Sequence, residues 1–191
     1  IILALFAVQI APYGEAEIFP VPYAPWGGDH IFGTDQIGRD VYTRLIYGAR
    51  NTVGIAIITT ILAFVIGGFF GLLAAISGSW ADQILSRLVD VMMAIPSLIF
   101  ALMLLSIFGT NAINLIIILA VLESTRVFRL TRAVGINIVV MDYVEVARLR
   151  GEKIGWVIRK EILPNILPPL VAEFGLRFCF TFLAIAALSF L

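Results

Sequence analysis

The chain has 191 residues, of which 61% are hydrophobic and 14% are charged, and its formal net charge is zero. A soluble globular domain is about 45–50% apolar and about 25% charged, so this composition predicts a membrane protein. The lack of a basic excess argues against nucleic acid as a partner, and one cysteine with one histidine exclude a disulfide framework and a metal site built from these two residue types.

Both ends of the chain lie in apolar runs, so we expect a fragment of a longer protein. A membrane-spanning helix needs about 20 predominantly apolar residues, and the run Ile1–Ile10 is too short to span alone. We therefore expect residues 1–11 to be the end of a first span whose start is missing. No basic region precedes this run, so it lacks the pattern of a signal peptide.

The next segment, residues 12–52, carries four prolines in its first half, and these favour extended and turning backbone. From Asp40 onward the pattern changes, because Val41, Leu45 and Ile46 recur at helical spacing. This pattern predicts a short amphipathic helix that lies in the membrane interface before the chain enters the bilayer.

Four further apolar runs predict membrane-spanning helices. The first of them contains no charge, and the second ends where Gly109 begins a turn. The third continues through a charged stretch that includes Glu123, and we expect those side chains to face protein or to reach toward the interface. The predicted spans are Val53–Ile76, Val91–Phe108, the helix that begins at Ala112, and Ile166–Leu191.

Lysine and arginine are concentrated in one loop. Eight of the thirteen lie between Arg126 and Lys160, whereas residues 12–51 carry three arginines against five acids. The positive-inside rule places the basic stretch in the cytoplasm and residues 12–51 outside. Three expected crossings separate the two segments, and an odd number of crossings places them on opposite sides of the membrane. The turn after Ser77 then lies inside, and the turn at Gly109 lies outside.

The cytoplasmic loop contains the most specific pattern. Asp142 is a favourable N-cap residue, Glu145 follows at capping-box spacing, and Gly151 provides a left-handed stop. These residues predict a helix of about two turns, Tyr143–Arg150, which is too short to be stable in water without a partner. A second short helix, Ile154–Ile162, is expected to end at Pro164. One face of the first helix is expected to consist of Tyr143, Val146, Ala147 and Arg150.

These residues resemble the signature of the permease subunits of ATP-binding-cassette (ABC) importers, in which a glutamate, a small pair and a glycine are followed by Ile-Leu-Pro. In this chain the signature reads Glu145-Val146-Ala147, Gly151 and Ile162-Leu163-Pro164-Asn165. Val146 departs from it, because the family usually has a second alanine there. The resemblance implies a coupling helix that docks in a groove of a separate ATPase subunit. The residues expected to dock are Asp142, Tyr143, Glu145, Val146, Ala147, Arg150 and Gly151.

Further stretches narrow the resemblance. Residues 32–40, Arg44, residues 47–50 and residues 187–191 are similar to the second permease of dipeptide, oligopeptide and nickel importers. The outer motif in this likeness consists of Gly33, Thr34, Asp35, Gly38, Arg39 and Asp40. The implied fold is all-α, a polytopic transmembrane helical bundle of the ABC importer permease type with about five of six spans present. Residues 53–191 are expected to form the permease domain, and residues 136–165 its coupling loop.

The resemblance implies a non-catalytic, multi-pass subunit of a transporter in the bacterial cytoplasmic (inner) membrane. Its expected partners are the lipid bilayer, a second homologous permease, two cytoplasmic ATPase subunits and an extracytoplasmic solute-binding protein. The sequence contains no P-loop, no Ser/His/Asp set and no metal cluster, so ATP and Mg²⁺ are expected to be used by the partner ATPases. Peptides are the favoured solute, and nickel complexes, opines and glycosides stay open.

For two groups of charged residues, the sequence leaves two possible roles open. Glu173 and Arg177 lie four residues apart in the last span, where they form either a mutual salt bridge on its cytoplasmic-side turn or a part of the translocation path. The outer motif either pairs charges to fix the amphipathic helix or contacts a substrate-delivering protein.

Two other function classes are weighed against the importer. A secondary carrier or channel would need ionisable residues at mid-membrane depth, and Val53–Ile76 and Val91–Phe108 have none. A membrane-embedded enzyme would need a nucleophile beside a base, and His30 lies in the outer segment with no obvious partner. Loss of ATP-coupled transport on mutation of Glu145 or Gly151 would favour the importer over both.

Overall fold

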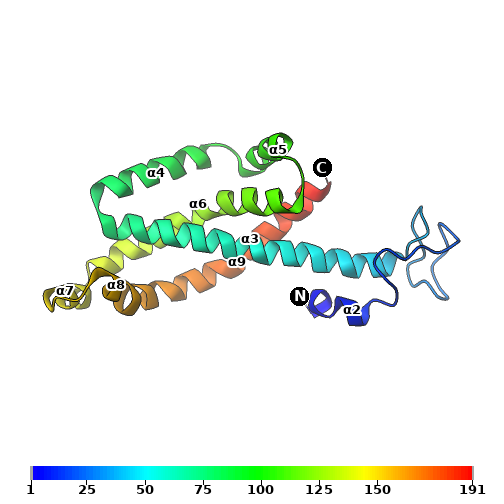
Figure 1. The fold of residues 1–191 in the computed structure, drawn as a ribbon, viewed down its shortest axis with the longest axis horizontal. Helices are drawn as coiled ribbons and strands as arrows, with labels where there is room; N and C mark the ends of the chain where they lie inside the picture. The colour runs from blue at the N-terminus through cyan, green and yellow to red at the C-terminus, as the bar shows by residue number, and fades with distance from the viewer. Residues whose placement is uncertain (1, 191) are drawn as a thin grey trace. The chain divides into compact units, whose positions relative to one another are not determined.

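Helices make up most of residues 2–190, the part of the chain that the computed structural model describes (Figure 1). Two isolated bridges occur in loops, and no strand forms in this described part, so the all-α prediction is confirmed. The chain divides into two compact units, residues 1–55 and 56–191. Unit 1 contains α1 (Ile2–Leu5), α2 (Ala7–Ile10), the outer loop and the start of α3 (Val41–Ser77).

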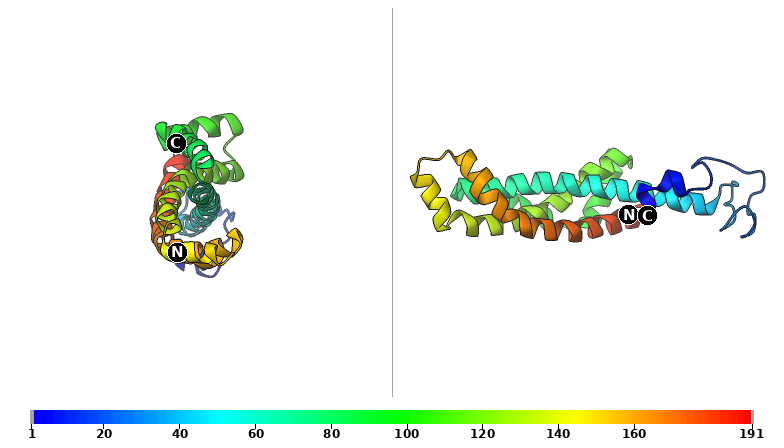
Figure 2. Two further views of the ribbon diagram at one scale, coloured as in Figure 1. Left: turned by 90° about the vertical axis from the view of Figure 1, so that its left-hand side faces the viewer. Right: turned by 90° about the horizontal axis from the view of Figure 1, so that it is seen from below.

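Unit 2 contains the rest of α3 and all later elements. These are α4 (Ser79–Ala94), α5 (Ser97–Phe108), α6 (Ala112–Val139), α7 (Asp142–Leu149), α8 (Ile154–Val157), the π-helix η1 (Ile158–Ile162) and α9 (Leu163–Phe190). In this unit α6 and α9 run side by side, and α4 and α5 pack against α6 (Figures 1 and 2). The short elements α7 and α8 lie together at one end of the unit.

The structure corrects the expectation of a separate amphipathic helix before the first complete span. Residues 41–77 form the single 37-residue helix α3. No proline interrupts this stretch, and neither Gly48 nor Gly54 adopts a positive φ. The helix therefore continues through the residues that the sequence assigned to two elements. Whether its first turns lie in the interface stays a prediction.

The expected span Val91–Phe108 is also corrected. The helix breaks between α4 and α5, and the two parts are bent by 89°. Pro96 is the cause, because a proline disfavours the helical conformation of the residue before it and has no N–H to donate. Ile95 accordingly has extended backbone, with φ −93° and ψ 132°.

The start of the last span differs in a similar way. Pro164 was expected to end a short helix, but residues 154–189 form one continuous helical run. The π-helix η1 ends at Ile162, two residues before this proline. Its wider turn accommodates a residue whose ring would crowd the preceding turn of a regular α-helix. The short helix is therefore the beginning of this continuous run.

By length and composition, two of the described helices are able to cross a membrane, α3 and the run Ile154–Ser189, and the bent pair α4–α5 makes a third if it is one span. The sequence predicted about five spans in the chain. The 28-residue helix α6 is long enough, but Glu123, Arg126 and Arg129 interrupt its apolar run. Crossings by α6 and by residues 1–11 stay predictions.

Candidate functional site

The helix α7 begins one residue earlier than the sequence predicted. Met141 is its N-cap residue, and no side chain caps the helix. The capping box assigned to Asp142 and Glu145 is therefore wrong, because Asp142 is already the first helical residue. Both carboxylates still lie in the first turn, where negative charge interacts favourably with the helix dipole.

The end of α7 agrees with the sequence. Gly151 has φ +80°, a conformation that glycine adopts without strain. Its N–H donates to the carbonyl of Arg148 at 2.9 Å, and the N–H of Glu152 donates to the carbonyl of Ala147 at 3.3 Å. These two hydrogen bonds form a Schellman motif, which stops the helix and satisfies its last carbonyl groups.

The predicted docking face of α7 is only partly exposed. Val144 and Ala147 are buried, so this side holds α7 against the chain, and Ala147 does not belong to an outward face. The outward apolar side chains are Tyr143, Val146 and Leu149, the last of which is 80% exposed. Leu149 was missed, although its spacing from Val146 places it on the same side of a helix. The exposed residues 143, 146 and 149 are called the α7 outer face below.

The inward side of α7 belongs to one buried cluster. It joins the ends of α6 and α9 to α7, α8 and η1, and it fixes the position of the short helix. Its members are Ile138, Val144, Ala147, Val157, Ile162 and Ile166. Such tertiary packing supplies the stability that a helix of eight residues lacks alone.

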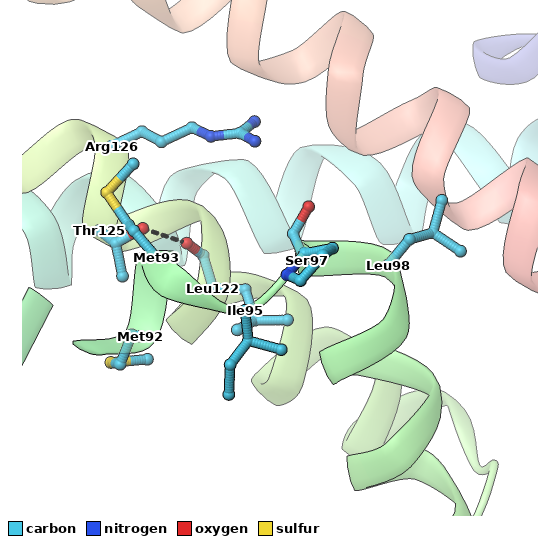
Figure 3. A pocket seen from close by; sticks show the side chains of 9 residues that line it. Met92, Met93, Ile95, Ser97, Leu98, Leu122, Thr125 and Arg126 are labelled. Atoms are coloured by element: carbon cyan, nitrogen blue, oxygen red, sulfur yellow. Dashed lines mark hydrogen bonds between the residues drawn. The ribbon is translucent and has the colours of Figure 1, made fainter. Parts of the chain in front are cut away.

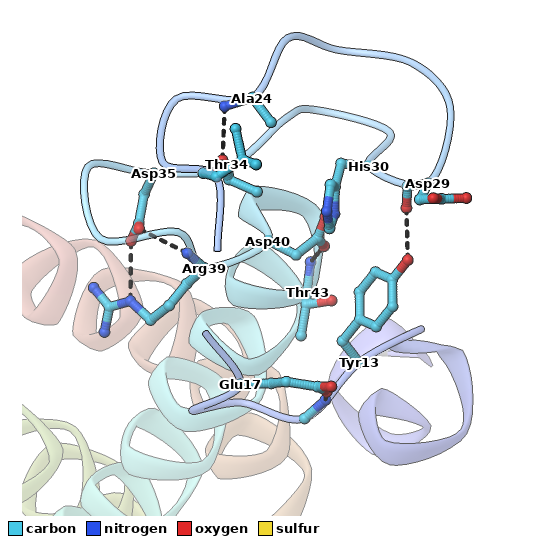
Figure 4. A network of polar contacts seen from close by, with 12 residues as sticks. Tyr13, Glu17, Ala24, Asp29, His30, Thr34, Asp35, Arg39, Asp40 and Thr43 are labelled. Carbon is cyan, nitrogen blue, oxygen red and sulfur yellow. Dashed lines mark hydrogen bonds and ion pairs between the residues drawn. The ribbon is translucent and has the colours of Figure 1, made fainter. Parts of the chain in front are cut away.

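The outer motif forms a network of hydrogen bonds within unit 1 (Figure 4). Thr34 is buried, and its hydroxyl donates to the carbonyl of Val21 and accepts from the N–H of Ala24, both at 2.8 Å. The backbone N–H of Thr34 donates to the carbonyl of Ala24 at 3.2 Å. Thr34 thus connects two segments of the outer loop.

Two glycines of the motif are required by their conformation. Gly33 and Gly38 have φ values of +73° and +83°, which side chains rarely adopt. A Cβ atom at either position would lie 2.3 Å from a backbone carbonyl oxygen, that of Ala24 or of Phe19 respectively. Only glycine fits here, so both residues serve the fold of the loop.

Asp35 organises the second half of the loop. Its carboxylate accepts the backbone N–H of Arg39 at 2.9 Å, the N–H of Ile37 at 3.0 Å, and the guanidinium groups of Arg39 and Arg44 at 3.0 and 2.8 Å. The pKa of Asp35 lies well below its ordinary value, chiefly because of the hydrogen bond from the Arg39 backbone. Burial opposes this effect, and the remaining donors reinforce it.

Asp40 caps helix α3. Its carboxylate accepts the N–H of Thr43 at 2.7 Å and lies 3.0 Å from Nδ1 of His30 (Figure 4). Burial acts to raise the pKa of Asp40, but the hydrogen bonds from Thr43 and His30 outweigh it, and the pKa is lowered. His30, for which the sequence offered no partner, also packs on the rings of Tyr13 and Phe19. It is therefore part of the loop structure.

Glu173 and Arg177 form an ion pair, with Arg177 Nε 2.6 Å from Glu173 Oε1. The sequence did not find their third partner, Glu123 of α6, whose Oε2 lies 3.6 Å from Arg177 Nη1. Glu123 also pairs with Arg126 at 3.4 Å. The pair lies ten and more residues beyond the start of α9, so it occupies the middle of that helix and not its cytoplasmic-side turn.

Two of the larger cavities adjoin this charged cluster. One, of about 590 Å³, lies between α5, α6 and α9 and is lined by Glu123, Arg126 and Arg177 among others. The second, of about 320 Å³, lies at the α4–α5 bend, where Met92 and Thr125 line it with Arg126 beside them (Figure 3). Both cavities have a mixed lining in which Arg126 is a shared member.

Residues 67–191 match the protein family described as "Binding-protein-dependent transport system inner membrane component". This chain belongs to that family. The resemblance to ABC importer permeases is therefore confirmed, and the chain is an inner-membrane permease component and not an enzyme of the transport system. The match includes all of residues 136–165 and all of α6 and α9.

Three permease relatives match almost the whole chain. The dipeptide transport system permease protein DppC of Alkalihalophilus pseudofirmus is 34% identical over 100% of this chain and 63% of its own length. The di/tripeptide transport system permease protein DppC of Pseudomonas aeruginosa is 36% identical over 98% of this chain and 64% of its own length. The dipeptide transport system permease protein DppC of Escherichia coli is 39% identical over 99% of this chain and 65% of its own length. The chain thus spans just under two thirds of the length of these relatives.

A solved structure supports the permease fold. It is titled "Crystal structure of an amino acid ABC transporter with histidines", and it matches with a TM-score of 0.51 and 25% identity. The match covers 78% of this chain and 77% of that chain.

Proposed function

We propose that this chain is the membrane-spanning permease subunit of an ATP-driven importer of peptides and forms half of its translocation path. The observation that carries the proposal is the α7 outer face, an apolar surface on a short helix whose other side is buried in the chain. Exposed apolar side chains on a rigidly held helix are suited to docking on another protein. Family membership supports an ATPase as that protein.

In this proposal the α7 outer face docks on a cytoplasmic ATPase subunit. Asp142, Glu145 and Arg150 surround the apolar residues and are candidates for polar contacts at the rim of the interface. Ala147 and Gly151 act indirectly, since the first packs α7 on the chain and the second ends it. ATP and Mg²⁺ are used by the partner, and closure of two ATPases would move the two coupling helices together.

The rest of the assembly follows the same reasoning. A second homologous permease would complete the path, and an extracytoplasmic binding protein would deliver the solute to residues 12–52. Residues 1–11 would be the end of a first span, and residues 53–191 the permease domain. The relatives named for dipeptide and tripeptide transport favour peptides over nickel complexes, opines or glycosides.

The test compares two substitutions of equally exposed residues. Val146, on α7, is 44% exposed, and Ile37, in the outer loop, is 48% exposed. Tagged full-length chain carrying Val146→Glu or Ile37→Glu is purified from native membranes in mild detergent, and co-purifying proteins are quantified by mass spectrometry. Burial of an unpaired charge in an interface weakens binding strongly, so we expect Val146→Glu to lose the P-loop ATPase by at least about tenfold and Ile37→Glu to retain it.

Two results would contradict the proposal. One is a wild-type chain that brings down no P-loop ATPase and transports without ATP after reconstitution, which would indicate a secondary carrier. The other is equal recovery of the ATPase with Val146→Glu and Ile37→Glu, which would show that the ATPase does not dock on the α7 outer face.

A further inference from the structure

The charged cluster in the middle of α6 and α9 is unusual for a membrane protein. Glu123 lies about 16 Å along α6, and Arg177 lies about 21 Å along α9, at a rise of about 1.5 Å per residue. Each position is near the middle of a 28-residue helix. In helices that cross a membrane, ionisable side chains near the middle are costly, and they commonly line the path of a substrate.

One carboxylate oxygen of this cluster has no hydrogen-bond donor. Glu123 is 7% exposed, and its Oε2 accepts no hydrogen bond from the residues that the structure describes. Nη1 of Arg177 lies 3.6 Å from this oxygen, and Arg177 makes its closer contact with Glu173 at 2.6 Å. A buried carboxylate oxygen without a donor is energetically unfavourable, so a cationic hydrogen-bond donor would be bound well at this position.

The same carboxylate lines a cavity that has room for a small solute. Its volume of about 590 Å³ lies within the usual range of small-molecule sites, about 300–1,000 Å³. Arg126 lines it beside Glu123, and its side chain is 39% exposed. Its only ion-pair partner in the described residues is Glu123 at 3.4 Å. The Arg126 guanidinium therefore has donors left for an anionic group.

The charges of the cluster balance. Two glutamates and two arginines sum to zero, and each of the two acids is paired with an arginine. A ligand with net charge would leave an uncompensated charge beside the buried Glu123 carboxylate. A zwitterion, which brings one ammonium group and one carboxylate, keeps the site neutral and satisfies both unfilled positions.

We propose that this cavity is a binding site for short zwitterionic peptides, in which Glu123 accepts the α-ammonium group and Arg126 donates to the α-carboxylate. Arg177, stacked over Phe180 at 5.2 Å from the ring centre, positions the Glu123 carboxylate together with Glu173. The inference rests on the proposed import function, because it assigns the peptide a resting place on its way through the permease.

The experiment uses the complete complex isolated through the tagged chain, placed in lipid nanodiscs and freed of its binding protein. Equilibrium binding of radiolabelled alanyl-alanine is measured, with N-acetyl-alanyl-alanine and alanyl-alaninamide as competitors. The first competitor lacks the ammonium group, and the second lacks the carboxylate. Loss of a charged hydrogen bond typically changes affinity about 10- to 100-fold, so we expect both competitors to bind at least about tenfold more weakly than alanyl-alanine.

Three variants separate a binding role from a structural one. Glu123→Gln should lower the affinity for alanyl-alanine and reduce the ratio of that affinity to the affinity for the acetylated peptide. Arg126→Gln should instead reduce its advantage over the amide. Asp90→Asn is the matched control. Asp90 is a carboxylate of α4 that pairs with Arg129 of α6, and neither residue lines the cavity. We expect Asp90→Asn to keep affinity and selectivity within about threefold of the wild type.

Equal binding of all three peptides to the wild type would overturn the inference. So would a loss in Glu123→Gln and Arg126→Gln that leaves the ratio between the peptides unchanged, since that is the result of a purely structural ion network. ATP-driven uptake by the wild-type complex is measured in parallel with its binding protein restored. Failure of uptake refutes the proposed function, whereas normal uptake with unaltered selectivity in both variants refutes only the peptide site.

Discussion

Two adjacent glycines of α3 give opposite predictions for the same substitution. A Cβ atom at Gly67 would lie 2.4 Å from the carbonyl oxygen of Ser124 in α6, whereas a Cβ atom at Gly68 would meet nothing within 4 Å. Alanine is favoured over glycine inside a helix by about 1 kcal/mol. Gly68→Ala is therefore expected to stabilise the protein, and Gly67→Ala has to overcome a collision with the α6 backbone.

The size of that collision follows from the distances. An ordinary contact between carbon and a carbonyl oxygen is about 3.3–3.6 Å, so Gly67→Ala forces α3 and α6 apart locally by about 1 Å. A gap of this size removes about a quarter to a half of the dispersion attraction across the contact. Overpacking of this kind costs about 1–3 kcal/mol. We expect Gly67→Ala to lower the free energy of unfolding by that amount, and Gly68→Ala to raise it by about 0.5–1 kcal/mol.

The measurement is the thermal stability of the purified chain in detergent. Each variant carries a fluorescent fusion, and the fraction that stays monodisperse after heating is followed by size-exclusion chromatography. The expected order of midpoints is Gly67→Ala lowest, wild type next and Gly68→Ala highest. A Gly67→Ala midpoint equal to or above that of Gly68→Ala would refute the close approach of α3 to α6 at this position.

Two further predictions concern the loops. Hydrogen bonds hold the pKa of Asp35 below its ordinary 3.8. Its stabilising effect is therefore fully present at neutral pH and is lost progressively as the pH falls from about 4 through the lower folded-state pKa. In urea titrations followed by tryptophan fluorescence, Asp35→Asn should thus be less stable than wild type at pH 7, and the difference should shrink below about pH 4; a constant difference would contradict this. In the second prediction, Gly151→Ala and Gly155→Ala both add a methyl group to open space, but only Gly151 has a positive φ. The α7 amides should exchange hydrogen faster in Gly151→Ala alone, because a left-handed non-glycine residue costs about 1–2 kcal/mol, and equal rates in the two variants would refute the role of the Schellman motif.

The sequence could predict those features of the site that depend on residues close together in the chain. The short helix between α6 and α9, its stop at Gly151 and the need for glycine at a turn are all encoded within a few residues. The capping assigned to Asp142 failed for a related reason, since N-cap patterns fit neighbouring registers almost equally well. The inward orientation of Ala147 was not predictable, because it depends on the cluster formed with α6 and α9.

The sequence by itself determined that this is a membrane protein and carried its resemblance to ABC importer permeases, because hydropathy, loop charge and short motifs are properties of consecutive residues. Only the tertiary structure decided that Ala147 faces inward, that His30 pairs with Asp40, and that Glu123 joins Arg177 across two helices. Contacts between residues far apart in the chain depend on how helices pack, and no local spacing specifies that packing. The cavity lined by Glu123, Arg126 and Arg177 lies between three helices, so only the tertiary structure could show it.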